Sequence, residues 1–251
     1  MPLLEICVET PAAIVAARDH GADRLEVCAA LALGGLTPSS GLVAFAVGSG
    51  LPVMAMIRPV AGDFTYDEDT LAIMADDIDR FAALGVAGVV FGILRRSTTL
   101  CELDHDALAR LVAHARAAGE RRRRPLATTL HRAIDLCTDP VGAVDDAIAI
   151  GFDNILSSGG VRTVSEGAAM LAAMAVRAGG RCTIIAGAGI ASHNVEAIVA
   201  STRVGAVHAS CTTDPAQPSE RTGTGIDFGD AIRPIDIRQL IALRHAVDRS
   251  L

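Results

Sequence analysis

The sequence contains no lysine, so all 22 of its Lys and Arg residues are arginines. A Schiff-base aldolase and a lysine-linked pyridoxal phosphate enzyme both depend on a lysine amine. Both mechanisms are therefore excluded, and we expect neither pyridoxal phosphate nor a Schiff-base lysine in this protein.

Long apolar runs and recognisable targeting signals are also missing. Charges and glycines interrupt every hydrophobic stretch before it reaches the length of a membrane span. The first residues, MPLLEICVET, lack the basic region and the cleavage site of an export signal, which predicts a cytoplasmic protein with no membrane partner. In that compartment we expect the six cysteines to be thiols, and the net charge of −7 argues against nucleic-acid binding.

What the chain of 251 residues does contain is a regular alternation of short apolar runs and amphipathic stretches. Several amphipathic stretches begin near Asp, Ser or Thr and end at Gly, which are the usual start and stop signals of helices. Eight apolar runs have the length and composition of strands, at residues 3–9, 24–30, 53–59, 88–94, 126–133, 154–160, 183–190 and 206–211.

Repeated strand–helix units joined by right-handed crossovers give parallel strands. Eight such units predict an α/β protein, a closed (β/α)8 TIM barrel that forms a single domain over residues 1–251. An open, doubly wound sheet is the alternative. We expect an irregular loop at residues 212–235, and a final helix from about Asp236 to Ser250 that closes the barrel.

The two-residue period of a strand predicts which side chains enter the barrel. The aliphatic residues of the first run should face the helices, so Glu5 and Cys7 should point into the lumen. The second run repeats the pattern Leu-Glu-Val-Cys. This repeat predicts that Glu5 lies beside Glu26 and Cys7 beside Cys28 on neighbouring strands.

Ionisable side chains gather where the predicted strands end. The stretch TLHRAID places His131, Arg132 and Asp135 directly after an apolar run. Barrel enzymes keep their sites at this C-terminal mouth, and buried charges need partners. A purely structural ion-pair network is the alternative. The candidates at the mouth are Arg24, Glu26, Arg58, Asp63, His131, Arg132, Asp135 and His208.

Two glycine-rich stretches follow the sixth and seventh predicted strands, SSGG at 157–160 and AGAGI at 186–190. Such turns expose backbone N–H groups, and barrels often bind phosphate near their last two loops. We expect a small anion to contact Gly159, Gly160, Gly187 and Gly189. The alternative is that tight strand-to-helix turns need glycine for their conformation alone.

Cys7 and Cys28 form a second candidate site. Two inward thiols on strands about 4.8 Å apart would hold a soft ion such as Cu(I), with Met54 or Met56 as a thioether ligand. The alternative is that both cysteines fill space in the lumen as small apolar residues.

Several motifs, taken together, resemble the CutC family, whose members are usually labelled copper homeostasis proteins. They are EICVET, GADRLEVCAALALGGLTPSSG, the segment from Met56 to Tyr66, FGIL, HRAID, ILSSGG and GAGI. The resemblance covers about Leu3 to Ser210. It implies a TIM-type barrel, a cytoplasmic location, self-association into a homo-oligomer, and a Cu(I) site at positions that match Cys7 and Cys28. The polar mouth residues named above also match the family.

The chain departs from the family at two places. Gly187-Ala188-Gly189-Ile190 stands where the family often has Gly-Gly-Gly-Ile, and Cys211-Thr212 replaces an Ala-Arg pair. The missing arginine removes an anion contact from the last loop, which leaves the ligand open.

Two classes of function follow, with a third kept open. The first is a Cu(I)-binding protein that uses Cys7 and Cys28. The second is an enzyme acting on a small anionic, carbohydrate-like substrate at the mouth. Its leading acid/base pair would be His131 and Glu26, with His208 as a further acid or base. Arg58 and Arg132 would bind the anion, and Arg24 is a further substrate-binding candidate. Asp63 and Asp135 would orient these groups. The third is a divalent-metal site made of His131, His208 and the mouth carboxylates.

Overall fold

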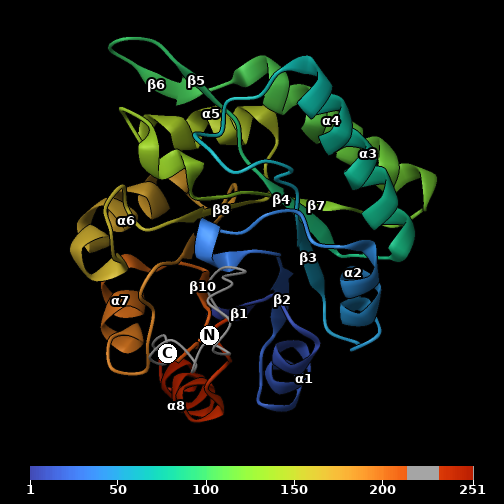
Figure 1. The fold of residues 1–251 in the computed structure, drawn as a ribbon. Helices are drawn as coiled ribbons and strands as arrows, with labels where there is room; N and C mark the ends of the chain where they lie inside the picture. The colour runs from blue at the N-terminus through green and yellow to red at the C-terminus, as the bar shows by residue number, and fades with distance from the viewer. Residues whose placement is uncertain (214–231, 251) are drawn as a thin grey trace, which may run out of the picture.

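The computed structural model describes residues 1–213 and 232–250, and the parallel strands in this part of the chain close into a barrel (Figure 1). Around the barrel the strand order is β1-β2-β3-β4-β7-β8-β9-β10 and back to β1. This closure confirms the predicted TIM barrel and excludes the open sheet. The strands are β1 (Leu3–Val8), β2 (Arg24–Val27), β3 (Val53–Met56), β4 (Gly88–Phe91), β7 (Ala127–Leu130), β8 (Asn154–Ser157), β9 (Thr183–Ala186) and β10 (Ala206–Ala209).

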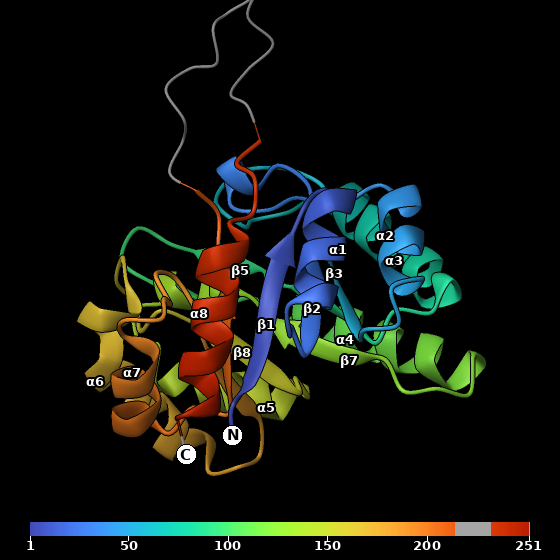
Figure 2. The same cartoon turned by 90° about the horizontal axis from the view of Figure 1, so that it is seen from below.

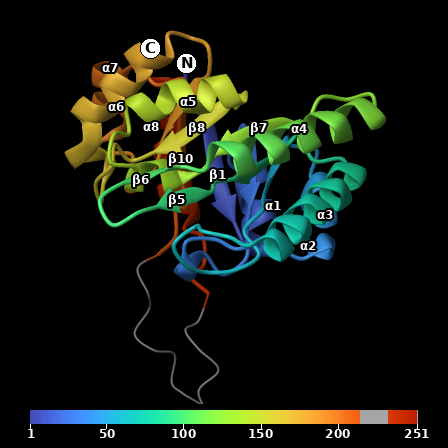
Figure 3. The same ribbon diagram turned by 90° about the horizontal axis from the view of Figure 1, so that it is seen from above.

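Helices surround the strands on the outside (Figures 1 and 3). Among the described residues, none of them combines the length and the apolar character that crossing a membrane requires. They are α1 (Pro11–Asp19), α2 (Ser40–Val47), α3 (Glu68–Leu84), α4 (His105–Arg121), α5 (Gly142–Ile150), α6 (Val164–Ala178), α7 (Val195–Thr202) and α8 (Ile237–Asp248).

The helix boundaries follow from the capping residues of the sequence. The side chains of Thr10, Asp67 and Asp104 accept hydrogen bonds from the first turns of α1, α3 and α4. Gly85 and Gly151 end α3 and α5 in the left-handed conformation, with φ of 95° and 104°. The capping signals therefore account for these starts and stops.

The last helix packs where the first and last strands of the barrel meet, as the sequence predicts. Asp236 caps α8, which lies beside β1 (Figure 2). From α8, the Arg244 guanidinium pairs with the Asp23 carboxylate at 2.9 Å, and the same carboxylate oxygen accepts the Leu4 N–H at 2.7 Å. Within the predicted loop of 212–235, Thr212 bridges to Ile235, and residues 214–231 lie outside the described residues.

The fourth predicted run is divided between two elements. Strand β4 ends at Phe91, and Leu94 begins a separate antiparallel hairpin of β5 (Leu94–Arg96) and β6 (Cys101–Leu103). Gly92 lies between them against the His131 ring, because an added Cβ there would fall 2.6 Å from two ring atoms. Strand β4 ends just before this close approach, and the sequence pattern did not predict the hairpin.

The lumen faces are as predicted, but the register between β1 and β2 is not. Strands of a closed barrel are staggered along its axis, and the stagger decides which lumen residues are level. Glu5 pairs with Arg24 and with His208, while Cys7 pairs with Glu26. The expected neighbours, Glu5 with Glu26 and Cys7 with Cys28, are wrong by two residues. Cys28 therefore lies two residues nearer the mouth than Glu26, the residue that is level with Cys7.

Candidate functional site

A pocket of about 580 Å³ opens at the C-terminal mouth of the barrel. Its size suits a small organic molecule. Apolar side chains such as Leu31, Met56 and Phe64 form part of its wall. The residues predicted for a site that do line it are Cys7, Glu26, His131, Arg132, Gly189 and His208.

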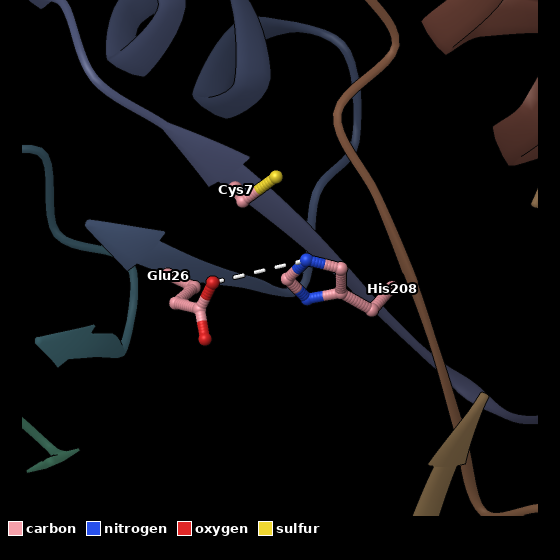
Figure 4. Close-up of side chains that lie close together, drawn as sticks. All are labelled: Cys7, Glu26 and His208. Atoms are coloured by element: carbon pink, nitrogen blue, oxygen red, sulfur yellow. Dashed lines mark ion pairs between the residues drawn. The ribbon is translucent and has the colours of Figure 1, made fainter. Parts of the chain in front are cut away.

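The most concentrated group of donor atoms in the pocket consists of Cys7, Glu26 and His208. One ligand atom from each of the three lies within 4.8 Å of the other two (Figure 4). The side chains come from β1, β2 and β10, which are neighbours in the barrel. The Nε2 atom of His208 lies 3.8 Å from a carboxylate oxygen of Glu26. Sulfur, nitrogen and oxygen ligands thus face one point.

Glu5, two residues before Cys7 on β1, contacts this cluster on the side away from the mouth. Its Oε1 lies 2.8 Å from His208 Nδ1, and its Oε2 accepts a hydrogen bond from Arg24 Nε at 2.6 Å. Burial alone would raise the pKa of Glu5, but the His208 hydrogen bond and the Arg24 charge outweigh it and lower the pKa. Glu5 is therefore an ionised carboxylate that turns His208 Nε2 toward Glu26, and Arg24 supports Glu5 instead of lining the pocket.

Glu26 differs from Glu5 although both carboxyls are buried. Burial raises the pKa of Glu26, and the nearby Glu5 charge acts in the same direction. The pKa of His208 is raised well above its usual value, because its interactions with Cys7, Glu26 and Glu5 outweigh the opposing effect of burial. The two carboxyls thus have different roles, one as a fixed charge and the other as a group that takes up a proton readily.

Cys28 is close to Glu26 but does not line the pocket. Its Sγ lies 3.5 Å from a Glu26 oxygen, in a fully buried cluster with Met54, Met56 and Val90. Burial raises the pKa of this thiol well above its usual value. The structure therefore corrects the predicted side-by-side pair of thiols: Cys7 faces the pocket, and Cys28 packs in the wall.

His131 follows β7 and begins the short helix η2 (Arg132–Leu136). Its Nδ1 accepts a hydrogen bond from the Ala133 N–H at 3.2 Å, and its ring packs against Phe64 with centroids 4.8 Å apart. Burial lowers the pKa of His131 to about 3, and the Arg58 charge acts in the same direction. The imidazole is therefore neutral at physiological pH, with its proton on Nε2.

Arg58 and Asp63 do not reach the pocket in the way the sequence suggested. The Arg58 guanidinium donates to the backbone oxygens of Leu33, Gly35 and Gly62, and lies over the Phe64 ring at 4.6 Å. It holds together the loops that follow β2 and β3. Asp63 is exposed and accepts hydrogen bonds from Thr65.

The predicted anion site at residues 157–160 already contains an anion, the carboxylate of Asp135. That carboxylate accepts hydrogen bonds from the Ser158 N–H, the Ser158 hydroxyl and the Gly160 N–H, all at about 3 Å, and from the Ser157 hydroxyl. Arg132 Nε donates to the same carboxylate at 2.8 Å. The SSGG turn after β8 thus binds the Asp135 carboxylate from the segment that follows β7, and Gly159 and Gly160 serve the conformation of that turn.

In the second glycine-rich loop only part of the expected contact surface faces the pocket. Gly189 lines it, whereas Gly187 packs against Leu156. The intervening Ala188 has φ of 78°, a conformation that favours glycine.

Three side chains of the site were not among the predicted candidates. Glu5 could have been found from its lumen-facing position, since it alternates with Leu4 and Ile6. His193 lines the pocket just after the AGAGI stretch. Phe64 contacts His131 from a loop that is distant in sequence, and no local pattern predicts that contact.

A closed barrel whose C-terminal mouth gathers a thiol, an imidazole and a carboxyl defines a TIM-barrel protein with a small polar site. The sequence profile of the CutC family matches residues 2–213. A CutC family protein of Sinorhizobium medicae is 40% identical over 247 residues, which cover 98% of this chain and 96% of the relative. One from Caulobacter vibrioides is 42% identical over 208 residues, 83% of this chain and 80% of the relative.

A solved structure of CutC from Streptococcus agalactiae, a protein provisionally assigned to copper homeostasis, is also similar. It is 29% identical, with a TM-score of 0.75, over 84% of this chain and 99% of that one. The chain belongs to the CutC family.

The first prediction separates the two mouth aspartates. Asp135→Asn should lower the free energy of unfolding by about 3 kcal/mol, because one of the two acceptor oxygens is replaced by an NH2 group that faces other donors, and the Arg132 charge loses its partner. Asp63→Asn, the matched control at an exposed carboxylate, should change it by less than about 0.5 kcal/mol. Reversible urea unfolding measures both, and equal effects would contradict the role assigned to Asp135.

The second prediction concerns pH. The folded chain holds the pKa of His131 at about 3, whereas an unfolded histidine titrates near pH 6.5. The unfolded state therefore binds the proton first, so this contribution to stability is present above about pH 6.5 and is lost as the pH falls toward 3.

Between pH 7 and pH 5, the wild type should lose about 2 kcal/mol of unfolding free energy more than His131→Gln, which lacks the titrating group. Urea unfolding of both proteins across this range tests the difference. Parallel pH profiles would show that His131 is not held neutral.

Proposed function

We propose that this protein binds Cu(I) at the mouth of its barrel, through the Cys7 thiolate and the His208 imidazole. The observation that carries the proposal is the convergence of Cys7, Glu26 and His208 within 4.8 Å. Thiolate and imidazole are ligands that suit copper, and the thiolate favours the soft Cu(I) ion. The Glu26 carboxylate lies beside these two ligands and offers a third ligand atom.

The surroundings of His208 support this assignment. A metal-bound histidine usually donates its second ring N–H to a carboxylate, which fixes the ring and increases the basicity of the ligand nitrogen. Glu5 lies 2.8 Å from Nδ1 of His208 and is itself held by Arg24. Nε2 would then be the ring nitrogen that faces the ion, and because the pKa of His208 is raised, copper binding would release the proton from this atom.

Cys28 is assigned no ligand role in this proposal. Its sulfur is fully buried, and its pKa is raised, so forming the thiolate there would be costly. The copper site therefore uses one cysteine with a histidine, in place of the two cysteines that the sequence suggested. Membership of the CutC family is consistent with a role in copper homeostasis.

The second candidate function is an enzyme that acts by acid/base chemistry on a small molecule. The observation that favours it is the pocket of about 580 Å³, which is larger than a metal ion requires. Glu26 and His208, 3.8 Å apart, would be its acid/base pair. His131 is neutral and buried, so a role as general base is assigned to the other two groups.

Copper binding is tested by anaerobic Cu(I) titration against a competing chelator. Cys7→Ser and His208→Gln should each weaken binding by more than about 100-fold, since each removes a direct ligand. Cys28→Ser is the matched control and should stay within about threefold of the wild type. Glu5→Gln should weaken binding by about 10-fold, as loss of a carboxylate behind a histidine ligand does.

Two outcomes of this titration would contradict the proposed ligands. Equal losses in Cys7→Ser and Cys28→Ser would restore the two-cysteine site. Unchanged affinity in Cys7→Ser and His208→Gln would remove the copper proposal and leave the enzyme as the better account.

A further inference from the structure

A buried hydrogen-bond donor in the pocket has no partner. The His131 side chain is 4% exposed, and its Nδ1 already accepts the Ala133 N–H. The neutral ring must therefore carry its proton on Nε2. Within residues 1–213 and 232–250, Nε2 has no hydrogen-bond partner, although His131 lines the pocket. Buried donors are rarely left unpaired unless a ligand or an ordered water completes them.

The ring is held in position on several sides. The Phe64 ring packs on it with centroids 4.8 Å apart, and the Arg58 guanidinium carbon lies over the Phe64 ring, 4.6 Å from its centroid. Gly92 allows the close approach that any larger residue would prevent. The unpaired donor is thus rigid, which is what a preorganised recognition group requires.

Backbone strain is concentrated around the same pocket. Phe64, Ala188 and Cys211 have φ of 66°, 78° and 48°, and all three line it. Residues other than glycine adopt this region at an energetic cost, and such residues cluster at ligand-binding sites. This observation is independent of the unpaired donor and points to the same cavity.

We propose that the pocket binds a small organic acid, with one carboxylate oxygen accepting the Nε2–H hydrogen bond of His131. Arg132 also lines the pocket; its Nε pairs with Asp135 and its Nη2 donates to Ser158, which leaves Nη1 as the guanidinium group that would donate to a second carboxylate oxygen. Leu31, Met56 and Phe64 offer an apolar wall for the rest of the molecule. The site goes beyond copper binding, because it requires no metal ion and uses none of the three clustered ligands.

The probe for this proposal is benzoate, a carboxylate on a compact apolar body, added to the metal-free protein labelled with ¹⁵N-histidine. Before addition, the spectrum should show His131 with its proton on Nε2. Benzoate should then bind with a dissociation constant of about 1 mM and shift the Nε2 resonance of His131. Benzylamine, which replaces the carboxylate with an ammonium group, should not bind.

Two variants test the donor itself. His131→Phe keeps a ring but removes the N–H, and should weaken benzoate binding by at least about 10-fold. His131→Gln places an amide N–H at a similar reach and should stay within about threefold of the wild type. Rescue by glutamine would distinguish a donor from a residue that only fills space.

The proposal is overturned if benzoate does not bind up to about 50 mM, or if all three proteins bind it equally. A His131 Nε2 resonance that stays unchanged at saturation also overturns it, and this readout uses the wild type alone, so misfolding of a variant cannot obscure it. Failure of the copper titration has no bearing on these results, since no metal ion is present.

Discussion

The stagger between β1 and its two neighbours is the constraint on which the mouth depends. Closing eight parallel strands requires each strand to slip along the next, so residues of equal sequence pattern do not end up level. In this barrel the slip brings Cys7 level with Glu26, and brings Glu5 level with both Arg24 and His208. A different stagger with the same side-chain faces would pair the two carboxylates and the two thiols, and no mixed cluster would form.

The stagger also solves an electrostatic problem. Two buried carboxyls at one level would repel each other in a poorly polarisable interior. Instead, Glu5 receives the Arg24 guanidinium on one oxygen and the His208 imidazole on the other. Glu26 receives no such pair of hydrogen bonds, and burial raises its pKa. The same arrangement that stabilises the barrel floor leaves a thiol, an imidazole and a readily protonated carboxyl facing the pocket.

Much of the fold could be predicted from the sequence because it depends on local patterns. The period of two residues fixed which side chains face the lumen, and Asp236 marked the start of the final helix. The register could not be predicted, because periodicity identifies a face but not a depth. Asp135 was placed at the right end of its strand, yet its carboxylate accepts hydrogen bonds from the turn after β8 and therefore occupies the place that an external anion was expected to take. Arg58 likewise binds carbonyl oxygens whose positions only the folded loops define.

The central claim is that the register makes a site of mixed ligands instead of a pair of thiolates. X-ray absorption spectroscopy of the Cu(I)-loaded protein, prepared anaerobically at one ion per chain, tests this most directly. We predict a first shell that contains one sulfur and at least one imidazole nitrogen, with the imidazole signal absent in His208→Gln. A shell of two sulfurs without imidazole would contradict the account, because it would place Cys28 in the site and leave His208 out of it.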